Sequence, residues 1–127
     1  MKRVLQTKAF ARWSKLPRQA LCDAAREIER GEYEADLGKG VVKKRVAYPG
    51  RGKSGGARVL VVKRMKGFLI FLTGRDKSSP GKDFTANQVE AAKELSVAYE
   101  ALSDRDVERA IQAGILLEIC NGKDAIA

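Results

Sequence analysis

Three runs rich in β-branched residues follow one another closely in the middle of the chain, and they constrain its fold more than any other feature. They are VVKKRVAY at 41–48, ARVLVVKR at 57–64 and GFLIFLTGR at 67–75. Runs of this length and composition predict strands. Because the intervening segments are too short for a crossover helix, neighbouring strands must run antiparallel. We therefore expect a three-stranded antiparallel meander at the centre of the fold.

The flanking segments predict one more strand and several helices. An apolar stretch at 3–6 predicts a short strand added at an edge of the sheet, and residues 8–16 and 17–30 carry apolar side chains at helical spacing, with Trp13 as a core anchor. Thr85 and Ser103 are candidate N-caps of two later helices, and the run 115–119 predicts either a strand or a partner-binding segment.

Together these elements predict an α+β fold. Its core is a small twisted antiparallel sheet with two N-terminal helices packed on one face, followed by a C-terminal helical extension. We expect residues 1–84 to form this core and residues 85–127 to add helices and a tail to the same single domain.

Composition excludes several kinds of chemistry. The chain has 127 residues and no histidine, which removes a Ser-His-Asp triad and most zinc sites. No secretory signal and no membrane-spanning apolar stretch are recognisable, so we expect a cytoplasmic protein without metal or cofactor. Cys22 and Cys120 are accordingly predicted to be two buried thiols rather than a disulfide.

Positive charge is concentrated in the middle third of the sequence. The net charge is +9. Residues 37–75 hold eleven lysines and arginines and no acidic residue, whereas the rest of the chain holds 14 basic and 16 acidic residues. Segregation of this kind is typical of a surface that binds a polyanion.

The stretch YPGRGKSGGAR at 48–58 resembles the end of a phosphate-binding P-loop, since Gly52, Lys53 and Ser54 fit the last part of that motif. However, Ala47 stands where the first glycine belongs, and a strand follows where a P-loop opens a helix. We therefore interpret residues 49–56 as a turn-rich basic loop, with Arg51 and Lys53 at its tip.

The chain resembles the toxins of bacterial type II toxin–antitoxin systems in the RelE superfamily, and within it the HigB-like branch. The similar segments are KAFARW, ADLGKGVVKKRVAYPGRGKSGGARVLV and ALSDRDVERAIQAGILLEI. This resemblance implies a RelE-like fold and a metal-independent endoribonuclease that cuts mRNA, in many members on the ribosome. It also implies a cognate antitoxin, usually with a helix-turn-helix DNA-binding domain, as partner.

One segment departs from that branch. TGRDKSSPG follows the last strand of the meander where relatives have a stretch similar to F-A-K-N-E. Lys77 takes the place of the lysine, whereas Ser78 and Ser79 replace the asparagine and the acid. The departure favours an alternative, a non-catalytic RNA- or ribosome-binding relative. A further alternative is a toxin of the ParE type that acts on DNA gyrase.

Metal-free RNA cleavage uses the 2′-hydroxyl as nucleophile and needs a phosphate clamp and a proton-transfer group. Arginine binds two phosphate oxygens at once, and lysine transfers protons when neighbouring cations lower its pKa. We therefore assign catalysis to Arg58 as clamp, Arg45 and Lys43 as backbone or transition-state contacts, and Lys77 as proton-transfer residue. The predicted RNA-binding residues are Lys44, Tyr48, Arg51, Lys53 and Arg75.

Three further residues near this site have plainer interpretations. Tyr48 could stack on a base, and a structural role in the turn is its alternative. Asp76 and Asp83 lie beside the predicted site in sequence, and we expect both to be solvated loop carboxylates.

Overall fold

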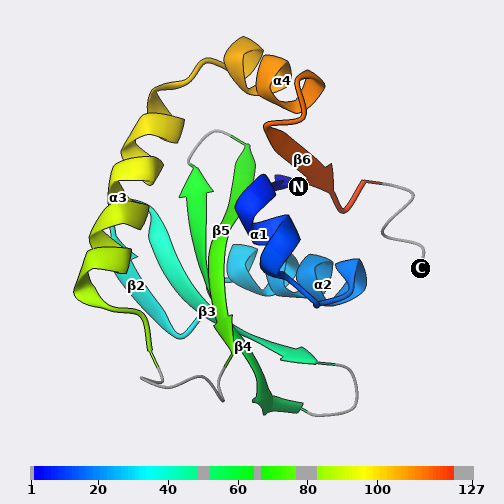
Figure 1. Cartoon of the computed structure of the whole chain (residues 1–127), viewed down its shortest axis with the longest axis vertical. Coiled ribbons are helices and arrows are strands. Elements are labelled where there is room, and N and C mark those ends of the chain that lie inside the picture. The colour runs from blue at the N-terminus through cyan, green and yellow to red at the C-terminus, as the bar shows by residue number, and fades with distance from the viewer. Residues whose placement is uncertain (1, 49–51, 65–66, 77–82, 122–127) are drawn as a thin grey trace.

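The computed structural model describes residues 2–48, 52–64, 67–76 and 83–121. Figure 1 shows the arrangement of four helices and six strands in this described part. In chain order they are β1 (Arg3–Thr7), α1 (Lys8–Trp13), α2 (Arg18–Glu29), β2 (Ala35–Gly38), β3 (Val41–Tyr48), β4 (Gly52–Arg64), β5 (Phe68–Asp76), α3 (Ala86–Ala101), α4 (Asp104–Gln112) and β6 (Leu116–Ile119). The predicted α+β, RelE-like fold is confirmed.

All six strands belong to one sheet with the order β2-β3-β4-β5-β1-β6. The predicted meander is confirmed, because β3, β4 and β5 are antiparallel neighbours. The predicted edge position of the first strand is wrong, since β1 lies between β5, to which it is parallel, and β6. Val4, Leu5 and Gln6 are buried one after another, which is typical of a strand covered on both faces.

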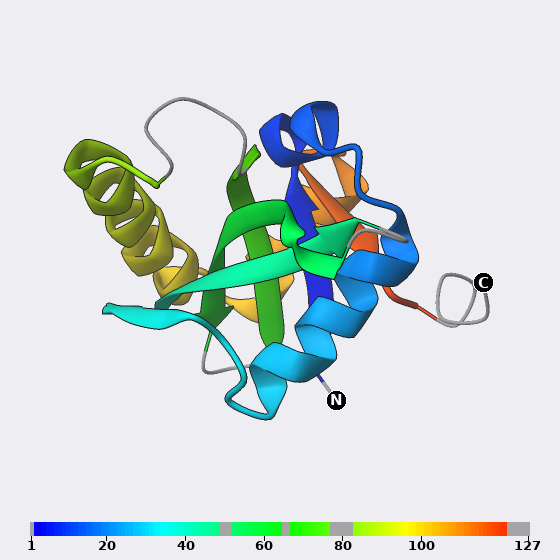
Figure 2. The ribbon, with the colours of Figure 1, turned by 90° about the horizontal axis from the view of Figure 1, so that it is seen from below.

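Helices cover both faces of the sheet. Alternation along the strands sends Val42, Val59 and Phe71 into one apolar cluster with α1 and α2, and Val41 and Leu60 into a second cluster with residues of α3 and α4. Figure 2 shows α2 and α3 on opposite sides of the strands. The two N-terminal helices therefore share one face, as predicted, and the C-terminal helices take the other.

Trp13 anchors α1 to the sheet, as its sequence context predicts. Its ring packs against Phe10 with 5.6 Å between ring centroids. The ring also lies directly over Gly74, where an added Cβ atom would come within 2.2 Å of a ring carbon. A close contact of this kind requires glycine in the strand.

The glycine-rich stretch is more regular than its composition predicts. Strand β4 begins at Gly52, so the loop expected over 49–56 is wrong from Gly52 onward. A Cβ atom at Gly56 would lie 2.0 Å from the carbonyl oxygen of Val46. The glycine thus allows close approach of β3 rather than a turn.

Side-chain caps and one buried arginine fix the C-terminal helices. Both predicted N-caps are confirmed, since the Thr85 and Ser103 hydroxyls each accept a backbone N–H bond from the first turn of their helices. Arg64, at the end of β4, is 1% exposed and donates to the carbonyls of Tyr99 (3.1 Å) and Leu102 (2.5 Å). It thereby satisfies carbonyl groups at the end of α3.

The prediction of two buried thiols is wrong, because Cys22 in α2 and Cys120 form a disulfide across 98 residues of sequence. Strand β6 pairs with β1, and this pairing brings the chain after Ile119 beside α2. Arg3 also holds this strand, since its guanidinium donates to both carboxylate oxygens of Glu118 at 2.8 Å.

Candidate nucleic-acid interface

Three arginines from three adjacent strands stand side by side at one end of the sheet. Arg45 of β3 is paired in register with Arg58 of β4, and Arg58 with Arg75 of β5. Because residues in register point to the same face, the three side chains form a row across strands about 4.8 Å apart. Lys43 points the same way two residues earlier in β3. We call these four residues the cationic row.

Two carboxylates neutralise part of the cationic row. Glu34 accepts from the Arg45 Nε atom at 2.8 Å and from the Arg58 Nε and Nη2 atoms at 3.2 and 3.3 Å. Asp83 accepts from the Lys43 Nζ atom at 2.8 Å, and its backbone carbonyl accepts from Arg75 at 2.9 Å. The row therefore has internal counterions on both sides.

The pKa of the Asp83 carboxyl group lies below its ordinary value. Partial burial raises this pKa, but the hydrogen bond from Lys43, the backbone N–H of Phe84 and the positive charges of Lys43 and Arg58 lower it further. The carboxylate form of Asp83 is thus a stable partner of the row over the whole neutral range.

Local structure explains why these two acids reach the row. Chain reversal after α2 passes through Gly31 at φ +83°, a conformation that glycine adopts without strain. The Glu34 N–H then donates to the Lys43 carbonyl at 2.8 Å, which fixes Glu34 beside β3. Thr85 begins α3 with a capping box to Gln88, and this fixed start holds Asp83 two residues upstream.

Burial decides which arginine is best suited to grip a phosphate. The side chain of Arg58 is 13% exposed, whereas that of Arg45 is 37% exposed. Charge interactions strengthen as water is excluded. Arg58, in the middle of the row, is therefore better shielded from water than Arg45.

The structure places two predicted RNA contacts elsewhere. Lys44 is 4% exposed, lies on the α2 face, and donates to Glu27 (2.7 Å) and to the Glu32 carbonyl (2.7 Å). Lys44 is therefore a buried structural cation, and we no longer assign it to the RNA-binding residues. Tyr48 also faces away from the row, and its hydroxyl donates to Asp76 at 2.7 Å, which favours the structural role for this tyrosine.

Three predicted residues have side chains outside the described part. Arg51 and Lys77 lie outside the described residues altogether. Lys53 falls within β4, but its side chain is likewise not described. Their roles stay predictions.

Sequence reasoning missed Glu34 and the contact of Asp83 with the row. Both lie outside the segment 37–75 that concentrates the basic residues. Asp83 lies in the loop before α3 with its side chain 48% exposed, as expected for a solvated loop carboxylate, but it also bonds Lys43. Their position in the sequence was the available signal. Glu34 directly precedes β2 and Asp83 lies shortly before α3, and both elements border the meander.

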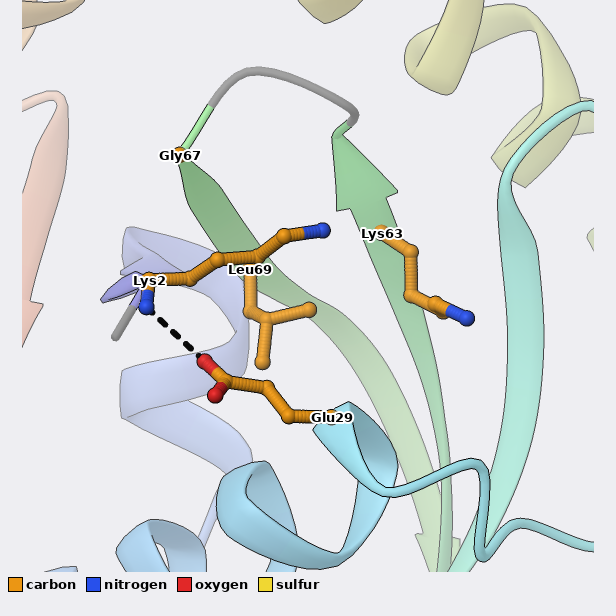
Figure 3. A pocket seen from close by; sticks show the side chains of 5 residues that line it. All are labelled: Lys2, Glu29, Lys63, Gly67 and Leu69. Carbon is orange, nitrogen blue, oxygen red and sulfur yellow. Dashed lines mark hydrogen bonds between the residues drawn. The ribbon is translucent and has the colours of Figure 1, made fainter.

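Several hollows lie beside the sheet. A cavity of about 360 Å³ borders the row and includes Tyr33, Glu34 and Arg45 in its wall. A second, of about 490 Å³, lies between the end of α2 and the β4–β5 end of the sheet. Figure 3 shows that the Lys2 backbone nitrogen bonds Glu29 there (2.9 Å) while Lys63 points away from this pair. The cavity beside the row is the one that a row-bound ligand could enter.

The fold and the cationic row define a class of protein: a small α+β protein that presents a row of basic side chains at one end of its sheet. A family model described as the RelE toxin of the RelE/RelB toxin–antitoxin system matches residues 2–119. The chain belongs to this family, and a toxin of a toxin–antitoxin system, with a cognate antitoxin as partner, follows from the membership.

A search among curated proteins finds no match. Within the described part, no helix combines the length and apolarity needed to cross a membrane.

Proposed function

We propose that this toxin is an endoribonuclease of the HigB-like branch, that it cuts mRNA on the ribosome in the cytoplasm, and that the cationic row holds the scissile phosphate. The observation that carries the proposal is the register of Arg45, Arg58 and Arg75. Like charges directly opposite one another destabilise a sheet. A row of three is therefore best explained by an anionic ligand.

The chemistry assigned to the row follows from its geometry. Arg58 clamps the phosphate and stabilises the charge that develops on the phosphorane. Arg45 and Arg75, on either side, bind neighbouring backbone oxygens, and Lys43 adds charge from the next position along β3. The cavity bordered by Tyr33 and Arg45 gives room for a nucleotide flanking the cut.

Proton transfer has two candidates. Lys77 remains the residue assigned from the resemblance to the family. Glu34 is the second, because its carboxylate contacts Arg45 and Arg58 and would therefore lie beside a phosphate bound by these arginines. Replacing Glu34 by glutamine separates its two roles: RNA should bind more tightly, because a competing anion is gone, while cleavage should become slower.

The decisive experiment adds the purified toxin, freed of antitoxin, to a translation reaction with one defined mRNA and maps new 5′ ends by primer extension. Arg58→Ala tests the clamp, and Arg105→Ala, an exposed arginine in α4, is the matched control. Cuts at codon-defined positions that require ribosomes are expected. They should fall by about 100- to 1000-fold in Arg58→Ala and persist in Arg105→Ala.

Failure would take one of two forms. Salt-sensitive binding to RNA or ribosomes without cleavage would support the non-catalytic relative, which the departure at 73–81 favours. Neither cleavage nor binding would contradict the RNA proposal and direct attention to DNA gyrase. If cleavage survived in Lys77→Ala and was lost in Glu34→Gln, the proton-transfer role would pass to Glu34.

A further inference from the structure

Helix α3 is rich in apolar residues but buries few of them. Of its 16 residues, Ala92 and Ser96 are buried, whereas the shorter α2 buries five. Leu95 and Val97 are 45% and 53% exposed. Most helical stability in proteins comes from packing an apolar face. Helix α3 thus leaves more of its apolar surface outside the core than α2 does, and Leu95 and Val97, two residues apart, lie on different sides of it.

One line of exposed residues runs along α3. Glu90, Glu94, Val97 and Ala101 are all exposed, and their spacing of four, three and four residues places them on one stripe of the helix. We call them the α3 stripe. Its half nearer Thr85 is acidic, and its half nearer α4 is apolar.

A cavity of about 630 Å³ opens beside the apolar half of the stripe. Val97 and Ala101 line it together with Gly40 of the β2–β3 turn. The Ser96 hydroxyl donates to the Lys39 carbonyl at 2.6 Å, so this polar pair is already satisfied. The volume lies within the range of pockets that hold apolar ligand groups. The cavity therefore suits apolar side chains.

Charge indicates what kind of molecule occupies this surface. Glu90 and Glu94 make the half of the stripe nearer Thr85 acidic, whereas Lys39 and Lys63 line the cavity together with Glu100. The negative charge is therefore confined to the acidic half of the stripe. A protein segment with one or two apolar anchors and a lysine or arginine one to two helical turns away would match the apolar and acidic halves of the stripe.

We propose that the antitoxin docks on the α3 stripe through such a segment, its apolar anchor seated in the cavity beside Val97 and Ala101. The inference rests on the toxin–antitoxin part of the proposed function and not on the nuclease mechanism. The cavity borders the β2–β3 turn at Gly40, and Lys43, the nearest member of the row, follows three residues later in β3.

The test measures binding of the cognate antitoxin to the full-length toxin by isothermal titration calorimetry. Val97→Arg fills the cavity with a charge that repels a basic partner, and Glu94→Lys reverses the acidic half without touching the cavity. Gln112→Arg on α4 is the control with the same added charge as Val97→Arg. Each stripe variant should bind at least about thirtyfold more weakly, and Gln112→Arg should bind as the unchanged toxin does.

Each other result would overturn the docking site. Equal affinity for all variants would place the antitoxin elsewhere, and equal weakening by Gln112→Arg would reduce the effect to net charge. Loss of toxin self-association in Val97→Arg, seen by sedimentation, together with unchanged antitoxin binding would make the stripe a contact between two copies. Thermal unfolding of each variant excludes misfolding, and RNA cleavage by the toxin alone reports the nuclease proposal separately.

Discussion

Removing the disulfide between Cys22 and Cys120 should destabilise the protein more than any single side-chain truncation. The bond closes a loop of 98 residues. In the chain-entropy treatment, a crosslink of that span lowers the entropy of the unfolded chain by about 16 cal/mol/K, which corresponds to about 4.7 kcal/mol at 25 °C. A small domain has a free energy of unfolding of about 5–15 kcal/mol. The double variant Cys22→Ala/Cys120→Ala should therefore retain a small margin of stability.

Urea unfolding followed by circular dichroism measures this effect. The double variant should have a lower midpoint and a steeper dependence on urea, because its unfolded chain is less compact. Cys22 is fully buried, so a reductant reaches the bond slowly without denaturant. When the unchanged protein is unfolded in the presence of a reductant, its urea midpoint and urea dependence should match those of the double variant. Identical unfolding of oxidised, reduced and doubly substituted protein would refute the reasoning and imply that the bond closes no loop in the unfolded state.

Three further predictions concern packing and charge. Arg64→Met should lower the free energy of unfolding by about 2–4 kcal/mol, because buried carbonyls at the end of α3 lose their donor; Arg105→Met is the exposed control, and equal unfolding of the two would contradict the role of Arg64. Gly74→Ala should lower the free energy of unfolding by about 1–3 kcal/mol through overpacking against Trp13. The fluorescence of this single tryptophan should shift as well. If Gly74→Ala were equally destabilising in a protein that already carries Trp13→Ala, a clash with the tryptophan ring would not be the cause. Asp83→Asn should be less stable than the unchanged protein at neutral pH, and the difference should shrink as pH falls below about 4. The reason is that the pKa of the Asp83 carboxyl group is lower in the folded than in the unfolded protein. The resulting stabilisation is complete above the unfolded-state pKa and is lost as pH falls through the folded-state pKa. A constant difference between pH 7 and pH 3 would show that Asp83 does not act through its charge.

Local sequence patterns were enough to predict most of the fold. The alternation in VVKKRVAY placed Lys43 and Arg45 on one face and Lys44 on the other, because successive side chains of a strand point to opposite faces. The hydroxyls at 85 and 103 marked helix starts for an equally local reason. Strand β2 was missed because ADLG has no β-branched residue, and its pairing with β3 supplies what its composition does not.

Long-range pairing accounts for the other errors. The position of β1 inside the sheet depends on β6, more than a hundred residues later, and the same pairing creates the disulfide. Glu34 and Asp83 reach the cationic row from two segments that only the folded chain brings together. Charge segregation in the sequence located the row, but its counterions could not be found without the tertiary structure.

These counterions determine which anions can occupy the row. A phosphodiester carries one negative charge, as the carboxylate of Glu34 does, so charge alone gives a single phosphate little advantage. Glu34 is moreover tethered beside Arg45 and Arg58, and a tethered group competes at an effective concentration on the order of millimolar. Free phosphate and a mononucleotide carry up to about two negative charges at neutral pH, but each must overcome that competition with a single phosphate group. A nucleic-acid strand would bring several linked phosphates to arginines on three adjacent strands, and each contact after the first would be intramolecular. If the row binds RNA as we propose, the internal carboxylates favour polymeric RNA over small phosphates.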